Sequence, residues 1–401
     1  MPTHEIALVP RDGFFVKDGR GWHTSASGRG HSLDWPFPPT LLGALRTSLG
    51  RAMEQGVPGA RFDGAAFRRE TVGASMGPVV PLRRLQGQQA WEPEHRMWPV
   101  PMDALYLSDA GKVQRLQPRQ PAAPTLGRDE DPAREALWTA TPREAKPESA
   151  PRWWTEGDFL AWLGEGTVKK HGDLEKRALE LPRRVDIRLG IDAETFTARE
   201  GMLFSSDTIE PLSTVDGHRW EWAIGLSAFV PIAAPIDSVP WTIGGDRRLA
   251  RPQPVQGLFE APTAMAFAGG ARGLRLVVVT PACFQNGWLP DGFSSRGGAY
   301  RGEIEGVAGD LVLRAAFVPR PEHVSGWDMA LNQPKPTLRL VRPGAVYFFE
   351  KVSGDAFSAE ELRSLWLAAI GARSNEGLGR VVPGRWTPGN DGMVDEGITV
   401  T

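Results

Sequence analysis

Residues 337–386 read TLRLVRPGAVYFFEKVSGDAFSAEELRSLWLAAIGARSNEGLGRVVPGRW and carry the clearest pattern of secondary structure in the chain. TLRLV and VYFFEKV are rich in β-branched and aromatic residues and flank the turn RPGA, which predicts a β-hairpin. Ser358 and Glu361 form a capping box, and apolar residues then recur at helical spacing up to a predicted cap at Gly371. After SNEGLG, the segment RVVPGRW predicts a last strand. This order is the second half of a βαββαβ unit.

The N-terminus supplies the first half of a similar unit. HEIALVP and GFFV, within residues 4–16, alternate as a strand, and PFPPTLLGALRTSLGRAMEQG predicts a helix that Thr40 can cap and Gly56 ends. TVGASMGPVVPLRRL predicts the next strand. We therefore predict an α+β protein with two ferredoxin-like (RRM-like) βαββαβ domains that carry long β-hairpin and loop insertions. The predicted domains are residues 1–231, with an insertion around 111–184, and residues 232–401, with the glycine-rich loop.

Two long segments interrupt the first domain. Residues 118–151 are rich in proline and charge and show no sustained period, which predicts an inserted loop or a poorly ordered segment. RRVDIRLGIDAETFTAREGMLFSSDTIEP alternates polar and apolar residues over a long span and predicts a long β-hairpin. Between them, EGDFLAWLGEG predicts a short helix.

Composition limits the class of protein. The 401 residues include one cysteine, Cys283, so an internal disulfide framework is excluded, and no cysteine and histidine spacing predicts structural zinc. No apolar run is long enough to cross a membrane, and MPTHEIALVPRDG lacks the features of a signal peptide. These features predict a cytoplasmic protein with no membrane contact, no metal and no cofactor.

The basic residues are mostly arginine. Eight of the 46 lysines and arginines are lysine, so 46 − 8 = 38 are arginine, although the formal net charge is −2. The planar guanidinium suits bidentate contacts with phosphate and stacking on bases. A GC-rich genome would produce the same bias. The arginine content therefore supports nucleic-acid binding without establishing it.

The glycine loop SNEGLGR, residues 374–380, is the main candidate for phosphate binding. A dinucleotide fingerprint requires its glycines between a strand and a following helix, whereas these follow a helix and precede a strand. A P-loop is excluded because no Gly-Lys-Ser/Thr follows. Two interpretations remain. In one, Gly377 and Gly379 let backbone amides approach an RNA backbone while Arg380 neutralises charge. In the other, the loop is a tight connection with an exposed arginine.

Five blocks, in this order, resemble a known family. They are PFPPTLLGALRTSLG (36–50), LGIDAETFTAREGMLFSSDTI (189–209), IGGDRRLA (243–250), KPTLRLVRPGAVYFFE (335–350) and SNEGLGRVVPGRW (374–386). Together they look like the third subunit of the Cmr complex, the type III-B CRISPR effector, within the RAMP superfamily. The resemblance implies two ferredoxin-like domains and no catalytic residue. It also implies that the protein binds the 5′ handle of the CRISPR RNA. The resemblance places the protein between the large cyclase-like Cmr subunit and a Cmr backbone subunit.

Single-stranded RNA is held by charge that tracks its backbone and by exposed planar groups. The candidate RNA-binding residues lie on the first helix, on the turn IGGDRR and on the glycine loop. They are Arg46, Gly244, Gly245, Arg247, Arg248, Gly377, Gly379 and Arg380. The near-neutral net charge favours a subunit whose surface mostly faces other proteins over a free-standing RNA-binding module.

An enzyme is the alternative. RAMP endoribonucleases process CRISPR repeat RNA and often use histidine as general acid or base, and His23 and His31 flank a glycine-rich loop. No tyrosine, lysine or second histidine stands at a suggestive spacing in the C-terminal domain, which favours the non-catalytic subunit. The consecutive acids at 129–131 are interpreted as a solvated charge run, not a metal site.

Overall fold

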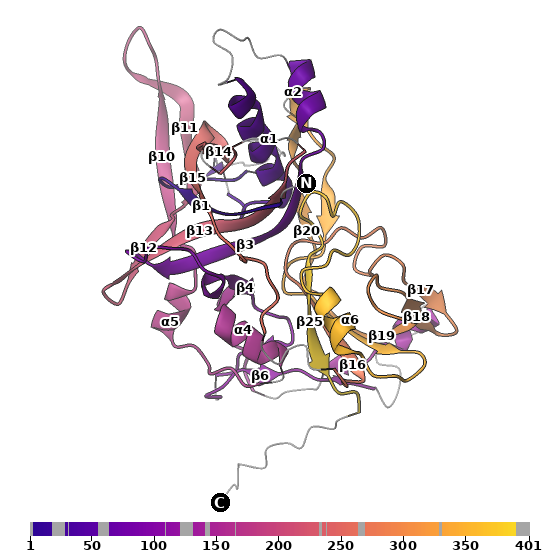
Figure 1. The fold of residues 1–401 in the computed structure, drawn as a ribbon. Coiled ribbons are helices and arrows are strands. Elements are labelled where there is room, and N and C mark those ends of the chain that lie inside the picture. The colour runs from indigo at the N-terminus through magenta and orange to yellow at the C-terminus, as the bar shows by residue number, and fades with distance from the viewer. Residues whose placement is uncertain are drawn as a thin grey trace, which may run out of the picture.

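The computed structural model describes residues 3–17, 29–30, 32–54, 64–108, 110–120, 131–140, 145–164, 166–231, 235–237, 239–263, 269–328 and 331–389. These residues form an α+β structure with two large antiparallel sheets and few helices, as the sequence predicted for the fold class (Figure 1). None of the described helices is long and apolar enough to cross a membrane.

The N-terminal sheet has β13 and β1 at its centre. β3 pairs with one edge of β13, β1 pairs with the other edge, and β15 and β14 follow outward from β1, while β12 forms a hairpin with the first residues of β13. The bounds are β1 (Thr3–Pro10), β3 (Ser75–Leu85), β12 (Leu212–Val215), β13 (His218–Phe229), β14 (Trp241–Ile243) and β15 (Arg248–Pro254). The boundary predicted between residues 231 and 232 cuts this sheet, because β15 pairs with β1 through its main chain.

Helix α1 (Pro38–Glu54) covers one face of this sheet. Leu41, Leu45 and Leu49 are at most 1 % exposed and pack against Ile6 and Leu8 of β1. This is the helical spacing that the sequence showed. The helix begins at Pro38, two residues before the predicted cap at Thr40, and proline is favoured in a first turn. A short helix, α2 (Gly64–Thr71), follows it in the chain.

The C-terminal sheet runs in the order β17-β18-β19-β24-β16-β25, and every neighbouring pair is antiparallel. The bounds are β16 (Gly273–Val278), β17 (Ser294–Arg296), β18 (Ala299–Gly302), β19 (Leu311–Phe317), β24 (Val346–Lys351) and β25 (Val381–Trp386). β16 is buried along its whole length, including the charged Arg275, and the first four residues of β24 are at most 1 % exposed. This sheet therefore lies at the centre of the larger core.

The predicted hairpin between TLRLV and VYFFEKV is wrong. Leu338–Leu340 forms β23 and pairs with β20 (Glu322–Val324), whereas β24 pairs with β16 and β19. The chain turns after Val341, which bridges to Ala282, and this contact directs the first segment away from the sheet. Two further short strands, β21 (Trp327–Asp328) and β22 (Gln333–Pro334), pair with each other.

Helix α6 (Ala359–Ser364) begins at the predicted capping box. Ser358 Oγ accepts from Glu361 N at 3.1 Å, and Glu361 Oε2 accepts from Ser358 N at 2.7 Å. The helix ends at Ser364, so Gly371 is not its cap. The predicted continuation is wrong because Leu367 adopts φ +56°, which breaks the helical path.

The Glu361 carboxylate also receives bonds from Lys351 Nζ (2.7 Å) and Ala308 N (2.9 Å). Partial burial would raise its pKa, but these bonds and the one from Ser358 N outweigh burial and lower the pKa to about 2. Because the folded pKa lies below the ordinary value of 4.5, Glu361 stabilises the fold above pH 4.5, and this stabilisation is lost as the pH falls toward 2.

Glu361→Gln should therefore unfold at lower urea concentration than the parent at pH 6, with the difference shrinking below pH 4. A difference independent of pH would contradict this account.

The predicted insertion around 111–184, together with the segment just before it from residue 97, forms a folded layer between the two sheets, and we call this layer the insertion below. Trp98 of β4 and Trp154 of β9 are fully buried, and α4 contributes Phe159 and Trp162 to the larger core. The elements are β4 (Met97–Pro99), β5 (Ala104–Leu105), β6 (Gln114–Arg115), β7 (Pro118–Arg119), α3 (Pro132–Glu135), β8 (Thr139–Ala140), β9 (Trp153–Thr155), α4 (Glu156–Leu163) and α5 (Asp173–Ala178). This layer joins the N-terminal sheet to the C-terminal one.

The interpretation of residues 118–151 as an inserted loop is wrong for part of its length. β7 pairs with β8, Ala133 of α3 is 1 % exposed, and Asp131 accepts hydrogen bonds from Ser295 and Tyr300 of the C-terminal sheet. Elements of two to four residues leave no period for a sequence pattern to show. Residues 121–130 and 141–144 lie outside the described part of the chain.

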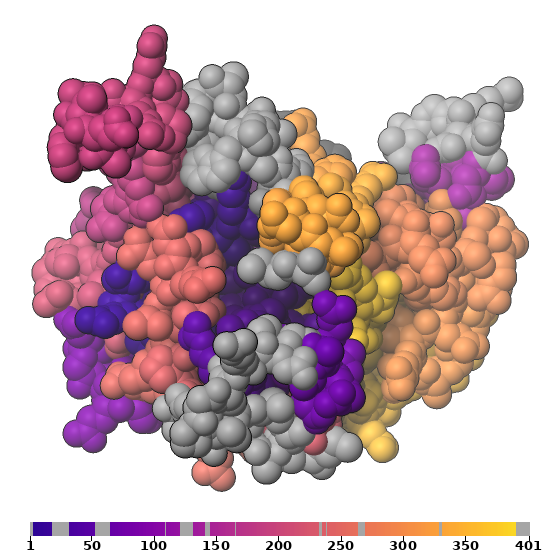
Figure 2. All heavy atoms as spheres, turned by 90° about the horizontal axis from the view of Figure 1, so that it is seen from above, coloured from indigo at the N-terminus to yellow at the C-terminus, as the bar shows by residue number. Residues whose placement is uncertain are grey.

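The predicted long hairpin is present as β10 (Arg183–Ile191) and β11 (Ala198–Ile209). β2 (Arg29–Gly30) adds a short parallel strand to β11. The hairpin projects from the body beside α1 and β14 (Figure 1) and stands out at the upper left of the view from above (Figure 2).

Candidate nucleic-acid interface

The glycine loop lies at the junction of the two halves. Met76 N, at the start of β3, donates to Asn375 O at 2.8 Å, and Leu378 is fully buried in a small cluster with Phe37 and Leu340. The loop thus connects the start of α1 and β3 to the C-terminal sheet. Its position is fixed by packing on both sides.

The amides of this loop are bonded within the chain. The bonds run from Gly377 N to Ser374 O (3.1 Å), from Gly379 N to Pro281 O (2.8 Å) and from Arg380 N to Thr280 Oγ1 (2.9 Å). An amide that donates to a buried acceptor is not free for a phosphate. The expectation that Gly377 and Gly379 let backbone amides approach an RNA backbone stays a prediction, and in this structure the amides of both glycines donate within the chain.

Arg380 also binds main-chain carbonyls. Its Nη2 donates to Ser374 O at 3.0 Å and its Nη1 to Leu367 O at 3.4 Å, and burial lowers the pKa of the guanidinium. The Arg380 side chain therefore joins the turn at Leu367 to the turn at Ser374. Of the two interpretations left open by the sequence, these contacts favour the tight connection, but with an arginine that is mostly covered.

Arg46 has a similar environment on α1. Its Nη2 donates to Val72 O at 3.3 Å and to Ala74 O at 3.5 Å, in the turn that leads into β3. The side chain is partly buried and ties the helix to this turn. Arg46 therefore lies near the glycine loop, which contacts Met76 and Gly77, but is already bonded to the main chain.

The turn between β14 and β15 needs its two glycines for close approach. Gly244 has φ +60°, and a Cβ there would lie 2.1 Å from Phe15 O. A Cβ on Gly245 would lie 2.0 Å from Phe15 Cζ, and Gly245 N donates to Phe15 O at 2.9 Å. The glycines are thus packed on Phe15, in the segment after β1. Their role is to position the residues that follow.

Asp246 and Arg247 follow these glycines with φ +56° and +49°. The Asp246 carboxylate binds Arg188 Nη1 of β10 at 2.7 Å, and Arg248 Nη1 binds Asp12 at 3.2 Å. Arg247 is exposed, and no hydrogen bond or ion pair joins its side chain to the rest of the described chain. Two consecutive non-glycine residues in the left-handed region are costly and are retained mostly at functional positions.

We call Asp12, Arg188, Asp246, Arg247 and Arg248 the arginine turn. Its formal charge is 3 − 2 = +1, and the acids are already paired with arginine, so the exposed guanidinium of Arg247 faces solvent without a competing partner. A planar cation in this setting can bind a phosphate or stack on a base. The sequence pointed to Arg247 and Arg248 but not to Arg188. Arg188 lies 58 positions from Asp246 in the chain, and the fold of the hairpin brings the two side chains together.

A model for a protein family described as "CRISPR-associated protein (Cas_Cmr3)" matches residues 6–386. The chain belongs to the Cas_Cmr3 family. It is therefore a subunit of a type III-B CRISPR effector complex, the class that the five sequence blocks indicated. No curated protein matches the chain.

Solved structures similar to this Cas_Cmr3 chain come from type III-B Cmr-beta complexes. One, bound to cognate target RNA and AMPPnP, has 11 % sequence identity and a TM-score of 0.41, with 86 % of each chain covered. A second, bound to cognate target RNA, has 11 % identity and a TM-score of 0.39 over the same coverage. A third, of the apo state, has 9 % identity and a TM-score of 0.26 and covers 64 % of this chain and 98 % of the other.

The hairpin of this Cas_Cmr3 chain exposes a strip of apolar side chains. Val185, Ile187 and Leu189 lie on one face of β10, with Leu203 opposite Leu189 on β11, and their exposed fractions are 48, 73, 49 and 64 %. Phe196, near the tip, is 82 % exposed. The alternation that predicted the hairpin could not reveal this, because alternation usually marks a face that is buried in the same chain.

The histidines of the enzyme alternative, His23 and His31, lie outside the described residues. Within the described part of the chain, no group of three or more histidine, cysteine, aspartate or glutamate residues is placed to hold a metal ion.

Proposed function

We propose that this Cas_Cmr3 chain is the third subunit of its Cmr complex and holds the 5′ handle of the CRISPR RNA. It acts without catalysis and bridges the large cyclase-like subunit to a backbone subunit. The observation that carries the proposal is the arginine turn, where a strained backbone holds Arg247 exposed and without an ion pair to any other described residue. Strain of about 1–3 kcal/mol per residue needs a compensating role, and binding of an RNA phosphate supplies one.

The strand order supports two ferredoxin-like domains. Counting the four main strands of each half along the chain, both sheets follow the order fourth-first-third-second, through β15-β1-β13-β3 and β25-β16-β24-β19. Each half lacks one of the two helices. The described residues between β13 and β15 contain no α-helix, and neither do those between β16 and β19. We propose that each half is a ferredoxin-like domain that retains one crossover helix, α1 or α6.

The hairpin supports a bridging role. A projecting two-stranded ribbon is only marginally stable alone in water, and its apolar strip exposes side chains that a protein surface would cover. Ile187 and Leu203 are the centre of such a contact. Because the chain belongs to the Cas_Cmr3 family, we propose that a neighbouring subunit of the complex covers this strip.

The non-catalytic role is supported by the chemistry of the arginine turn. Guanidinium groups stay protonated at neutral pH, and its two carboxylates are paired with arginine. These groups bind phosphate but do not exchange protons near neutrality. The alternative endoribonuclease would cut repeat RNA without added metal, and His23→Ala or His31→Ala would abolish the cutting.

Arg247→Ala should lower the amount of CRISPR RNA that copurifies with the complex and reduce the salt slope of RNA binding by about one. Arg247→Lys should retain the charge but restore binding only in part, because lysine cannot make bidentate contacts. The measurement is the ratio of RNA to protein in tagged complexes purified at two salt concentrations, with the bound subunits identified.

Arg296→Ala is the matched control, since Arg296 is an exposed arginine on β17 and pairs with Asp310 at 3.1 Å. RNA occupancy equal in Arg247→Ala and the parent complex would contradict the proposed site. Copurification of the chain without other Cmr proteins would contradict the bridging role.

A further inference from the structure

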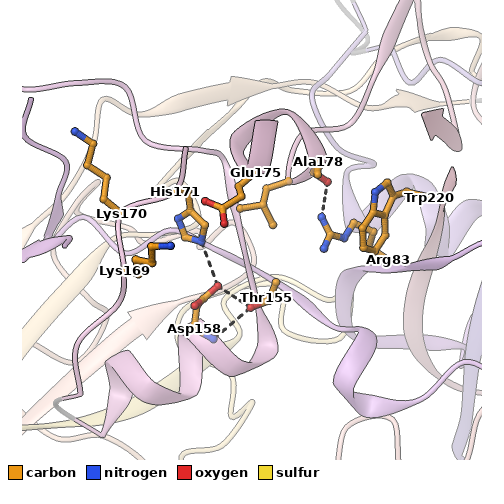
Figure 3. Close-up of a pocket in the computed structure, with 10 residues that line it drawn as sticks. Arg83, Thr155, Asp158, Lys169, Lys170, His171, Glu175, Ala178 and Trp220 are labelled. Carbon is orange, nitrogen blue, oxygen red and sulfur yellow. Dashed lines mark hydrogen bonds and ion pairs between the residues drawn. The ribbon is translucent and has the colours of Figure 1, made fainter. Parts of the chain in front are cut away.

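A pocket of about 360 Å³ lies between the insertion and the N-terminal sheet, away from the arginine turn. Arg83 of β3 and Trp220 of β13 form one side, and α4 and α5 supply Asp158 and Glu175 (Figure 3). Lys169, from the segment between the two helices, faces Arg83 across the pocket. The pocket therefore combines cations with an indole ring.

Arg83 is a partly buried cation without an ion pair. Its Nη1 donates to Ala178 O at 2.5 Å, and its guanidinium lies 4.0 Å from the centre of the Trp220 ring. Burial lowers the pKa of Arg83 to about 10, although Asp158 acts in the opposite direction. Among the described residues no carboxylate lies within ion-pair distance of it. A buried cation in this state gains stability from an anion.

Asp158 is already bonded to its neighbours. Thr155 Oγ1 donates to Asp158 Oδ2 at 2.7 Å, and His171 Nε2 lies 3.3 Å from the same oxygen. The other ring nitrogen, His171 Nδ1, lies 2.8 Å from Tyr106 Oη, which also accepts from Trp154 Nε1 at 2.8 Å. Asp158 therefore has hydrogen-bonding partners within the fold.

The charges that line the pocket leave room for an anion. The lining cations are Arg83, Lys169 and Lys170 and the lining anions are Asp158 and Glu175, so the formal sum of the lining is 3 − 2 = +1, and it is zero once Glu148, the partner of Lys170, is included. Lys170 is bonded to Glu148 at 3.0 Å, and one oxygen of Glu175 accepts from Gly172 N at 2.7 Å. Among the cations that line this pocket, Arg83 and Lys169 have no ion pair with another described residue.

We propose that this pocket binds a small phosphorylated molecule with a planar apolar group, of which a nucleoside monophosphate is the simplest. The phosphate pairs with Arg83 and Lys169, and the planar group lies against Trp220 and Leu179. Charge-assisted bonds from a guanidinium and an ammonium fix the phosphate, and the indole contributes apolar contact area. This site takes a free small molecule and is separate from the RNA contact proposed at the arginine turn.

The test is calorimetric titration of the full-length chain, without RNA, with three probes: AMP, inorganic phosphate and adenosine. We expect AMP to bind one site per chain, phosphate to bind more weakly and adenosine to give no detectable heat. Arg83→Met and Lys169→Met should each weaken AMP binding by about tenfold or more. Lys169 is exposed, so its substitution keeps the test valid even if Arg83→Met disturbs folding.

Arg219→Met is the matched control, because Arg219 is the exposed neighbour of Trp220 on β13 and points to the opposite face of the strand. It should bind AMP as the parent does. Failure of the parent chain to bind AMP, or equal affinities in Arg83→Met, Lys169→Met and Arg219→Met, would overturn the proposal. Equal affinities for AMP and phosphate would overturn the assignment of a planar group.

Discussion

Asp103→Ala should lower the free energy of unfolding by about 3–5 kcal/mol, because it leaves Arg275 as an unpaired charge in the core. Asp103 is fully buried and Arg275 is 1 % exposed, and their ion pair of 2.9 Å joins the insertion to β16 of the C-terminal sheet. Asp103 also accepts from Trp162 Nε1 at 2.9 Å, so alanine leaves this buried N–H without its acceptor as well. Urea unfolding followed by tryptophan fluorescence measures the change.

Two variants make this prediction specific. Asp310→Ala removes the partner of the exposed Arg296 and should change the stability by less than about 1 kcal/mol. The double variant Asp103→Leu, Arg275→Met removes both charges and should be more stable than Asp103→Ala alone, since no buried charge is left without a partner. If Asp103→Ala costs no more than Asp310→Ala, the buried pair does not hold the insertion to the sheet.

The elements with strong local signals could be predicted from the sequence. The periodic leucines of α1, the capping box at Ser358 and the alternation of β10 and β11 each depend on neighbours a few residues away. The failures involve distant partners. Leu338–Leu340 has the composition of a strand that could pair with β24, but the bridge from Val341 to Ala282 directs it to β20.

The candidate RNA-binding residues show the same contrast between local signals, which the sequence reveals, and contacts with distant residues, which it does not. The sequence singled out glycines and arginines at 377–380 and 244–248, but it does not show which carbonyl each donor meets. Gly379 N donates to Pro281 O, almost a hundred positions away, and Arg380 joins Ser374 of its own loop to Leu367. Only Arg247 remains exposed among the predicted arginines, because its strained turn points it away from the acids that bind its neighbours.

Gly379→Ala should destabilise the chain by more than about 3 kcal/mol. Gly379 has φ +71°, which costs a residue with a side chain about 1–3 kcal/mol, and its Cβ would lie 2.0 Å from Ile370 O. The main chain cannot retreat easily, because Gly379 O accepts from Ile370 N at 2.9 Å and Gly379 N donates to Pro281 O. Thermal unfolding of the variant and parent measures the loss.

Gly354→Ala separates backbone strain from the steric clash. Gly354 has φ +80°, but a Cβ there meets no atom within 4 Å, so only the cost of the left-handed conformation applies, about 1–3 kcal/mol. The additional loss of stability in Gly379→Ala, relative to Gly354→Ala, then measures the clash with Ile370. Equal losses in the two variants would show that the loop can move away and is not held by packing.

Gly379→Ala and Arg247→Ala together test whether the glycine loop acts on RNA through the fold. If the loop is structural, Gly379→Ala should lose RNA only in proportion to the protein that fails to assemble, whereas Arg247→Ala should lose RNA from fully assembled complexes. RNA occupancy per assembled complex distinguishes the two. A loss of RNA from assembled Gly379→Ala complexes larger than that in Arg247→Ala would return the RNA contact to the glycine loop and contradict the assignment to the arginine turn.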